Sequence, residues 1–494
     1  MKNAHIKNAQ WLAAAGIVAA FGMTAPAQAA DWVMLQGVER PDVTHRFFGV
    51  VQLNYANNFG CDPLEGLVGT SAVNNGLLVN NCRVAPELRD QKADFYIPNL
   101  QVGLRGNLIP GRINYFAAVN AGQNAANYQL GNTERKHLLT LTDASLTFSY
   151  IPGVRVRAGR MRVPGAEEFY SGLKAKDYMF PTDYNSRVYL ERMVKGNAKN
   201  TTSIPGQGYG TQAGNGLGPI TGNINTYAED SSFGRDMGIQ FFDAFKNEKW
   251  THTYAVMIGK GEGIHGFDIA DDKYDRNLYW SSEYDLPGGA GPLKHGVKLY
   301  AYHQDGVRQF IIDSAGTKSK DFDRIRYGIG AKALGEIFGE GRGKHRLGFE
   351  LNYAEGMIFH SNTASAADAP FGGLMQIAAE RDNKARGITL DYGYYLNKNW
   401  QFDVRWSRDN LLYETDGKNW TPGFERIYTN TTLGVNYHFT PDMRLTFNYE
   451  FRNAEAPNPQ LNANGTVNVA STNNQNQQTR SIGDRFGFRL EYEF

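Results

Sequence analysis

After its first residues, the 494-residue sequence lacks any long apolar run, and it contains only two cysteines and almost no net charge. A membrane-spanning helix needs about 20 apolar residues. The apolar stretch 11–23 is shorter, follows Lys2 and Lys7, and is followed by the small residues Ala27 and Ala29. This arrangement predicts a cleaved secretory signal over residues 1–29 and export of the chain. A membrane protein with this sequence would therefore have to cross the bilayer with strands.

The small net charge argues against an electrostatic partner. The formal charge is +1, and loss of the two lysines of the signal leaves about −1, so nucleic acid is not expected to bind. The sequence also has no His-Glu-x-x-His, Gly-x-Ser-x-Gly or Cys-x-x-Cys-His motif. We therefore predict a protein that is not an enzyme and that binds no metal and no cofactor.

The two cysteines lie in one turn-rich segment. Cys61 and Cys82 belong to an exported chain, where oxidising conditions favour a disulfide over metal ligation. We predict that they form a disulfide that staples a loop.

The main positive feature is an alternation of apolar and polar residues, which is typical of strands with one apolar face. At the C-terminus one face carries Phe486, Phe488, Leu490, Tyr492 and Phe494. The segments 433–439 and 443–451 repeat the pattern, and their polar face includes charges. In a membrane barrel that face lines a watery lumen while the apolar face meets lipid. Repetition along the chain favours such a barrel over a soluble sandwich.

The alternation predicts an all-β transmembrane antiparallel barrel of about 16 strands, which is wide enough for an aqueous channel. The predicted strands are 45–57, 94–108, 112–122, 139–150, 153–163, 234–244, 249–260, 277–286, 296–308, 323–335, 345–358, 385–396, 400–413, 426–439, 443–455 and 481–494. Aromatic residues such as Tyr392, Tyr394, Trp400, Tyr437 and Phe439 fall near strand ends, as in the interfacial girdles of membrane barrels.

Connections between these strands alternate in length. Tight turns are expected at 109–111, 151–152, 397–399 and 440–442, and long links at 58–93, 164–233, 359–384 and 456–480. Short turns on one side and long loops on the other place both termini in the periplasm. We therefore predict a short periplasmic segment 30–44 before the barrel 45–494. An inward fold of the long third loop, 164–233, would narrow the lumen to a constriction.

Strand parity identifies candidate pore-lining cations. With the apolar face toward lipid, the polar face presents Arg105, Arg155, Arg157, Lys298, Arg324, Arg326, Arg405 and Arg444. Arginine suits oxyanions because its planar fork donates parallel hydrogen bonds. Alternatively, these cations only neutralise the acids of the same face, which are Asp143, Glu283, Asp285, Glu350, Asp391 and Asp403. Arg160 and Arg162 have the opposite parity, which indicates a bulge near Gly159 or a strand that has left the lipid.

Three segments, 156–164, 189–192 and 234–240, resemble the phosphate-selective porin O and P family, in its strand before the third loop, a Glu-Arg element within it and the strand after it. The resemblance implies a sixteen-stranded porin, a homotrimer, and passage of small anions or other polar solutes. Family members that bind phosphate have a lysine cluster in the third loop. Here Lys174 and Lys176 are accompanied by Glu167, Glu168, Asp177, Asp183 and Glu191, so phosphate itself is not assigned.

The hypothesis is thus an outer-membrane porin, embedded in lipid, for passive diffusion of small polar solutes or ions, with a preference for anions. One alternative is a barrel that sheathes a partner protein for export or electron transfer. Another is a barrel-embedded hydrolase, which would need a nucleophile and a base on adjacent strands; the sequence offers no such set.

Overall fold

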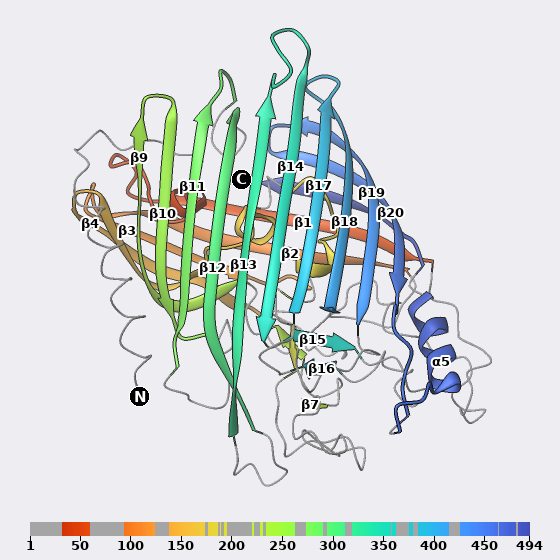
Figure 1. Cartoon of the computed structure of the whole chain (residues 1–494). Coiled ribbons are helices and arrows are strands. Elements are labelled where there is room, and N and C mark those ends of the chain that lie inside the picture. The colour runs from red at the N-terminus through yellow and green to blue at the C-terminus, as the bar shows by residue number, and fades with distance from the viewer. Residues whose placement is uncertain are drawn as a thin grey trace.

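The chain forms a closed antiparallel barrel of sixteen strands in a computed structural model (Figure 1). The residues described by the structure are 32–59, 93–123, 138–172, 176–185, 188, 192–194, 220–221, 228–230, 234–261, 273–289, 294–311, 319–356, 358–361, 375–378, 384–413, 425–462, 464–480 and 483–494.

Neighbouring barrel strands follow the order of the chain. They are β1 (Arg46–Asn58), β2 (Ala93–Ile109), β3 (Ile113–Asn120), β4 (Thr140–Ile151), β5 (Val154–Arg162), β9 (Arg235–Asn247), β10 (Trp250–Gly259), β11 (Asp275–Asp285), β12 (Gly296–Ile311), β13 (Ser319–Gly335), β14 (Lys344–Gly356), β17 (Lys384–Tyr395), β18 (Trp400–Tyr413), β19 (Arg426–Thr440), β20 (Met443–Glu455) and β21 (Arg485–Glu493). The predicted fold class and strand number are confirmed, and the bounds of β18 and β20 are those predicted.

Smaller elements lie in the links between barrel strands. They are the helices α2 (Trp32–Leu35), α3 (Glu167–Tyr170) and α5 (Val469–Arg480), and the strands β6 (Arg192–Val194), β7 (Ile220–Thr221), β8 (Ala228–Asp230), β15 (Ile358–Ser361) and β16 (Met375–Ala378). β6 pairs with β8, and β16 lies between β15 and β7.

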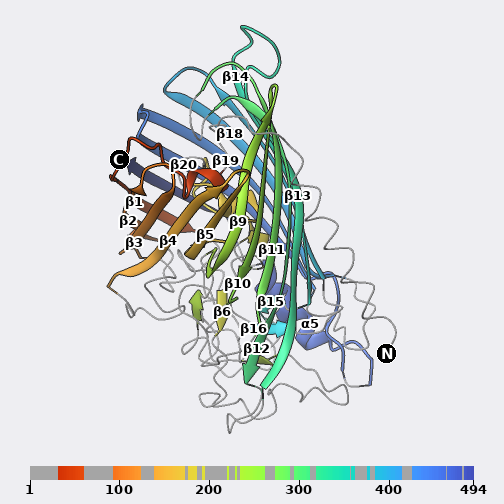
Figure 2. The ribbon, with the colours of Figure 1, turned by 90° about the vertical axis from the view of Figure 1, so that its left-hand side faces the viewer.

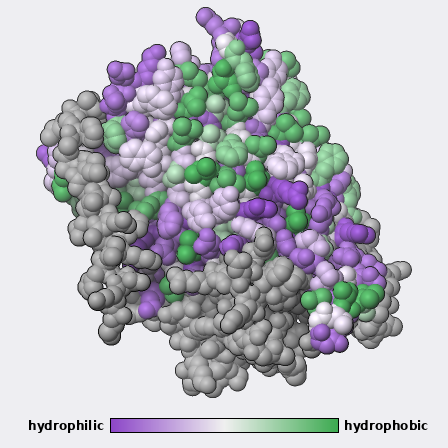
Figure 3. All heavy atoms as spheres, viewed as in Figure 1, coloured by the Kyte–Doolittle hydropathy of each residue, from purple (hydrophilic) through white to green (hydrophobic). Residues whose placement is uncertain are grey.

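The wall is apolar outside and polar inside. On β18, Trp400, Phe402 and Val404 are 41%, 43% and 37% exposed, whereas Asp403 and Arg405 between and beside them are each 5% exposed. The apolar side chains therefore point away from the barrel, the reverse of a soluble protein, as lipid requires. Figure 3 shows hydrophobic residues gathered over the middle of the wall in view and hydrophilic residues at its upper rim.

The two ends of the barrel differ in their connections. Short turns such as 396–399 and 441–442 join strands at one end, whereas α5 and the small sheet of β7, β15 and β16 lie at the other (Figure 1). At the short-turn end the ring of Tyr437 packs 4.7 Å from Trp400 and 4.9 Å from Phe439, measured between ring centroids. The predicted alternation of connection lengths and the aromatic residues at the strand ends are both present.

The C-terminal strand closes the barrel. β21 pairs with β1 from Val50 opposite Glu493 onward. The backbone of Phe494 then exchanges two hydrogen bonds with Gly49, of 2.9 and 3.1 Å. A Cβ atom at Gly49 would clash with the Phe494 ring, so glycine is needed at this closing pair.

The first described residues, 32–38, lie inside the barrel (Figure 2, red). Val33 of α2 is fully buried and packs in one cluster with Phe242 and Ala255, whose side chains face inward from β9 and β10. Its carbonyl oxygen accepts a 2.9 Å hydrogen bond from Arg157 Nη2. Glu39 Oε2 forms an ion pair of 2.7 Å with Arg105 Nε. The N-terminal segment thus fills part of the lumen.

Candidate functional site

The third loop, residues 163–234 between β5 and β9, turns back into the barrel where the structure describes it. Glu167 of α3 is 1% exposed. Its Oε1 lies 2.7 Å from Lys298 Nζ and 3.0 Å from the Tyr279 hydroxyl, and its Oε2 lies 3.3 Å from Lys332 Nζ. Burial by itself raises the pKa of Glu167, but the charges of Lys298 and Lys332 outweigh it and lower the pKa to about 2. A charged Glu167 thus fastens the loop to β11, β12 and β13.

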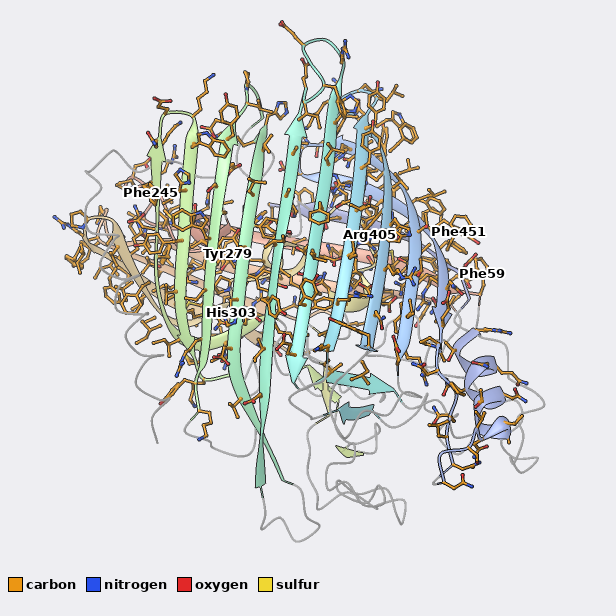
Figure 4. All side chains as sticks on the ribbon, viewed as in Figure 1. Phe59, Phe245, Tyr279, His303, Arg405 and Phe451 are labelled. Carbon is orange, nitrogen blue, oxygen red and sulfur yellow. The ribbon has the colours of Figure 1, made fainter. Side chains whose placement is uncertain are left out.

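The next residue, Glu168, contacts a different part of the wall from Glu167. Its Oε1 accepts hydrogen bonds of 3.0 Å from Arg405 Nη1 and from the backbone N–H of Thr182. Tyr279 and Arg405, which hold the two glutamates, come from well-separated strands, β11 and β18 (Figure 4).

A second anchor of the loop is Asp177, ten residues after Glu167. Its carboxylate lies 3.1 Å from Arg346 Nε, 3.4 Å from Arg444 Nη1 and 3.0 Å from Gln401 Nε2. Burial raises the pKa of Asp177, but Arg346 and Arg444 outweigh it and hold the pKa below its usual value. Because these partners lie on β14, β18 and β20, the loop crosses the lumen between its two anchors.

Wall arginines also hold the backbone of the loop. Arg405 Nη2 donates to the carbonyl oxygen of Phe180 (2.6 Å), Arg444 Nη2 to that of Lys176 (2.7 Å) and Arg489 Nη2 to that of Met179 (2.7 Å). A guanidinium that already serves a carbonyl and a carboxylate has few donors left for a solute.

Of the cations expected from strand parity, Lys298, Arg405 and Arg444 meet at the third loop. The others have separate partners: Arg105 binds Glu39, Arg155 pairs with Asp243, Arg157 binds Val33 and Gln240, Arg324 binds Gln304, and Arg326 donates to the carbonyls of Ile325 and Glu355. Lys174, Cys61 and Cys82 lie outside the described residues, so their predicted roles remain predictions.

Arg160 and Arg162, whose parity is opposite to that of Arg155 and Arg157, make different contacts from each other. The register of β5 with β9 is continuous through Gly159. Arg160 is paired with Met237, an exposed residue of the outer face, and donates to the carbonyl of Leu141. Arg162, the last residue of β5, donates to carbonyls of the third loop. The alternation of inward and outward side chains therefore breaks down at the end of β5, at Arg162.

A cavity of about 240 Å³ lies between the third loop and the wall. Its charged lining residues are the seven cations Arg162, Lys176, Arg235, Lys332, Arg346, Arg405 and Arg489 and the three acids Glu168, Glu350 and Asp391. The lining also includes a row of amides from β1, β2 and β3, namely Gln52, Asn99, Gln101 and Asn120. The excess of cations makes this cavity positive.

Three of these cations have no carboxylate in ion-pair contact among the described residues. Arg162 Nη1 contacts the carbonyls of Tyr170 (3.2 Å) and Ser171 (3.0 Å). Arg489 binds Asn54 and backbone oxygens. The ammonium of Lys176 has neither a hydrogen bond nor an ion pair with a described residue, and its Nζ lies 5.3 Å from the ring centroid of Phe169. These three charges are left to act on whatever enters the cavity.

Comparison with known proteins agrees with this architecture. Residues 74–198 match the model of the family described as phosphate-selective porin O and P. Within this closed sixteen-stranded barrel, the match covers the strand β5 and the anchored part of the third loop. The chain is thus similar to this porin family over those residues, and the match together with the closed barrel supports an outer-membrane channel.

Solved structures similar to this chain include three bacterial proteins. They are a loop-deletion mutant of OmpT from Vibrio cholerae (9% identity, 92% of this chain and 99% of that one, TM-score 0.47), the channel DcaP of Acinetobacter baumannii (11%, 92% and 99%, 0.43) and an anion-selective porin from Comamonas acidovorans (12%, 92% and 100%, 0.44). No curated protein matches the sequence.

The resemblance to the phosphate-selective porin O and P family that the sequence indicated is confirmed over residues 74–198, and neither the scaffold nor the hydrolase hypothesis is favoured. None of the helices in the described part of the chain is long and apolar enough to cross a membrane. Within that same part, no group of three or more His, Cys, Asp or Glu side chains could hold a metal ion.

Several residues of the cavity were missed by the sequence reasoning. Arg346 and Arg489 lie on the polar parity of their strands, so the alternation itself could have identified them. Lys332 lies on β13 with the same parity as Arg324 and Arg326, so the alternation could have identified it as well. Arg235, by contrast, begins a strand, where parity gives little guidance.

The N-terminal segment supplies a prediction about the size of the porin's passage. Deleting residues 32–38 removes the buried Val33 and opens the space beside Arg157, so single-channel conductance should rise. Conductance in planar bilayers measures this. The folded band on an unheated gel is the control for an intact barrel, and an unchanged conductance with that band present would contradict the prediction.

Proposed function

We propose that the porin lets small anions diffuse through the outer membrane in preference to cations, and that the cavity beside the third loop is the selective constriction. The observation that supports this most is the excess of cations in its lining, including three with no acidic partner among the described residues. Cations at a narrow point attract anions and repel cations, and the low dielectric of the surrounding protein strengthens the effect.

Reversal potentials in a KCl gradient test the proposal. With the purified porin in a planar bilayer, the sign of the potential should correspond to chloride crossing more readily than potassium. A potential of the opposite sign would overturn the anion preference, and an absence of conductance would overturn the channel itself.

The proposal extends to processing and assembly. We propose that residues 1–29 are removed during export and that the mature chain assembles as a homotrimer, as the family resemblance implies. A gel of unheated and heated samples tests assembly: a trimer band should collapse on heating to one monomer band. Mass spectrometry of the intact chain tests cleavage, because the mature mass should begin near residue 30.

The anion preference should depend on pH near neutrality. Burial, reinforced by the charges of Arg162, Arg489 and Arg235 and opposed by Glu168, lowers the pKa of Lys176 to about 7. Lys176 is charged below this pKa and neutral above it, so the preference for chloride should weaken as pH rises through about 7. Reversal potentials at a series of pH values measure the change.

Two variants at this position separate the titration of Lys176 from that of other groups. Lys176→Arg should keep the strong anion preference across the series because arginine stays protonated. Lys176→Met should show the weaker preference at every pH. An equal pH dependence in all three proteins would contradict the role of Lys176.

A further inference from the structure

In the cavity beside the third loop, the cation with the fewest contacts among the described residues is Lys176, and it lies near an aromatic ring. Lys176 Nζ lies 5.3 Å from the centroid of Phe169, and both residues line the cavity with Pro98, Met179 and Pro181. Pro98 belongs to β2, whereas the other residues belong to the loop. The cavity lining therefore combines the charge of Lys176 and the ring near it with further apolar side chains.

The hydrogen-bond donors of the cavity are unevenly available. Arg489 already uses its Nε, Nη1 and Nη2 on Asn54, Tyr178 and Met179. Arg162 Nη1 serves two loop carbonyls. In the described part of the chain Lys176 has no such partner, and an ammonium offers three donors from a single point.

This distribution suits one kind of anion better than another. Inorganic phosphate carries its charge on several hydrated oxygens and needs many donors to replace that water. A carboxylate with an apolar body needs only a local charge for its head and an apolar surface for its body. We propose that the constriction selects organic monocarboxylates with an apolar body, aromatic acids among them, with Lys176 binding the carboxylate and Phe169 contacting the body.

The inference rests on the proposed anion preference and names the solutes that the same site favours. Its test is the block of KCl current in planar bilayers by benzoate, acetate or inorganic phosphate, each added at about pH 6, where Lys176 is charged. Benzoate should reach half-block at a concentration roughly five to ten times lower than acetate or phosphate, the advantage expected from partial burial of one ring.

Matched variants assign the effect to the two residues. Phe169→Ala should abolish the advantage of benzoate over acetate, whereas Phe169→Tyr, which keeps a ring, should retain it. Lys176→Gln should weaken the block by both carboxylates. Phe338→Ala removes a ring that is 51% exposed in the 336–343 turn, and it should leave all three blocks unchanged.

The outcomes distinguish the inference from the proposed function. A wild-type porin selective for potassium over chloride would overturn both. An anion-selective porin that benzoate blocks no better than acetate, or that phosphate blocks best, would overturn the inference alone. Retention of the benzoate advantage in Phe169→Ala, with the folded trimer band present, would overturn the assignment to Phe169.

Discussion

Replacing both Arg162 and Lys176 with glutamate should abolish the proposed anion preference. The lining of the constriction would change from seven cations and three acids to five of each. Neither cation has an acidic partner among the described residues, so each reversal changes the field at the cavity and breaks no ion pair within that part of the chain. Arg162→Glu also removes two hydrogen bonds to loop carbonyls, so the folded band on gels must be checked in this variant. The reversal potential in a KCl gradient should fall close to zero.

A charge-matched control uses two lysines at the short-turn end, which do not line the cavity. Lys246 is exposed and Lys249 lies in the neighbouring short turn, so Lys246→Glu plus Lys249→Glu changes the net charge equally without altering the constriction. Its reversal potential should match that of the wild type. If the two double variants behaved alike, the net charge of the barrel would be responsible, and the constriction would not be the selective point.

The same reasoning changes what is expected from Arg155 and Arg157, which strand parity alone would choose for such an experiment. Arg155 is already paired with Asp243, and Arg157 is fully buried under the N-terminal segment. A glutamate at position 157 would place a carboxylate beside the carbonyl of Val33. Reversal there should disturb the packing of that segment more than ion selectivity.

Removing both anchors of the third loop should enlarge the passage and destabilise the barrel. In Glu167→Gln plus Asp177→Asn, Lys298 and Arg444 lose carboxylates to which each lies within 3.4 Å in buried surroundings. Breaking a buried ion pair by removing one partner costs about 3–5 kcal/mol. Single-channel conductance should rise, and the folded band on gels should disappear at a lower temperature.

A more exposed ion pair supplies the control for that experiment. Asp285 pairs with Lys246 and Lys294 at the short-turn end. A pair of this kind contributes about 0–1 kcal/mol. Asp285→Asn should therefore leave both conductance and thermal stability nearly unchanged. A loop double variant with wild-type conductance and stability would show that the loop is held by its backbone contacts alone.

The strands could be predicted from the sequence because their signal is local. In a barrel wall every second residue meets lipid, so the segment that became β18 carries Trp400, Phe402 and Val404 on one face whatever lies across the lumen. The same local rule identified the alternation of short turns and long loops. It assigned Arg405 and Arg444 to the inner face, where the structure has them buried.

The partners of those inner residues could not be predicted in the same way. Asp177 meets Arg346 and Arg444 across more than 160 residues of sequence because the third loop crosses the lumen. Arg157 lies under residues that precede the first strand. Such contacts depend on the path of two segments with no periodic pattern, and a period-two rule has no information about them.

The sequence alone thus predicted how the wall of this barrel is built, because lipid imposes the same alternation on each strand. Only the tertiary structure decided which charges remain for a solute. Wall arginines such as Arg405 are already bound to groups of the loop. Lys176 and Arg162, in contrast, line the cavity with no carboxylate in ion-pair contact among the described residues. Whether a charge is neutralised depends on neighbours brought together by folding, and parity along a strand specifies only the side on which it lies.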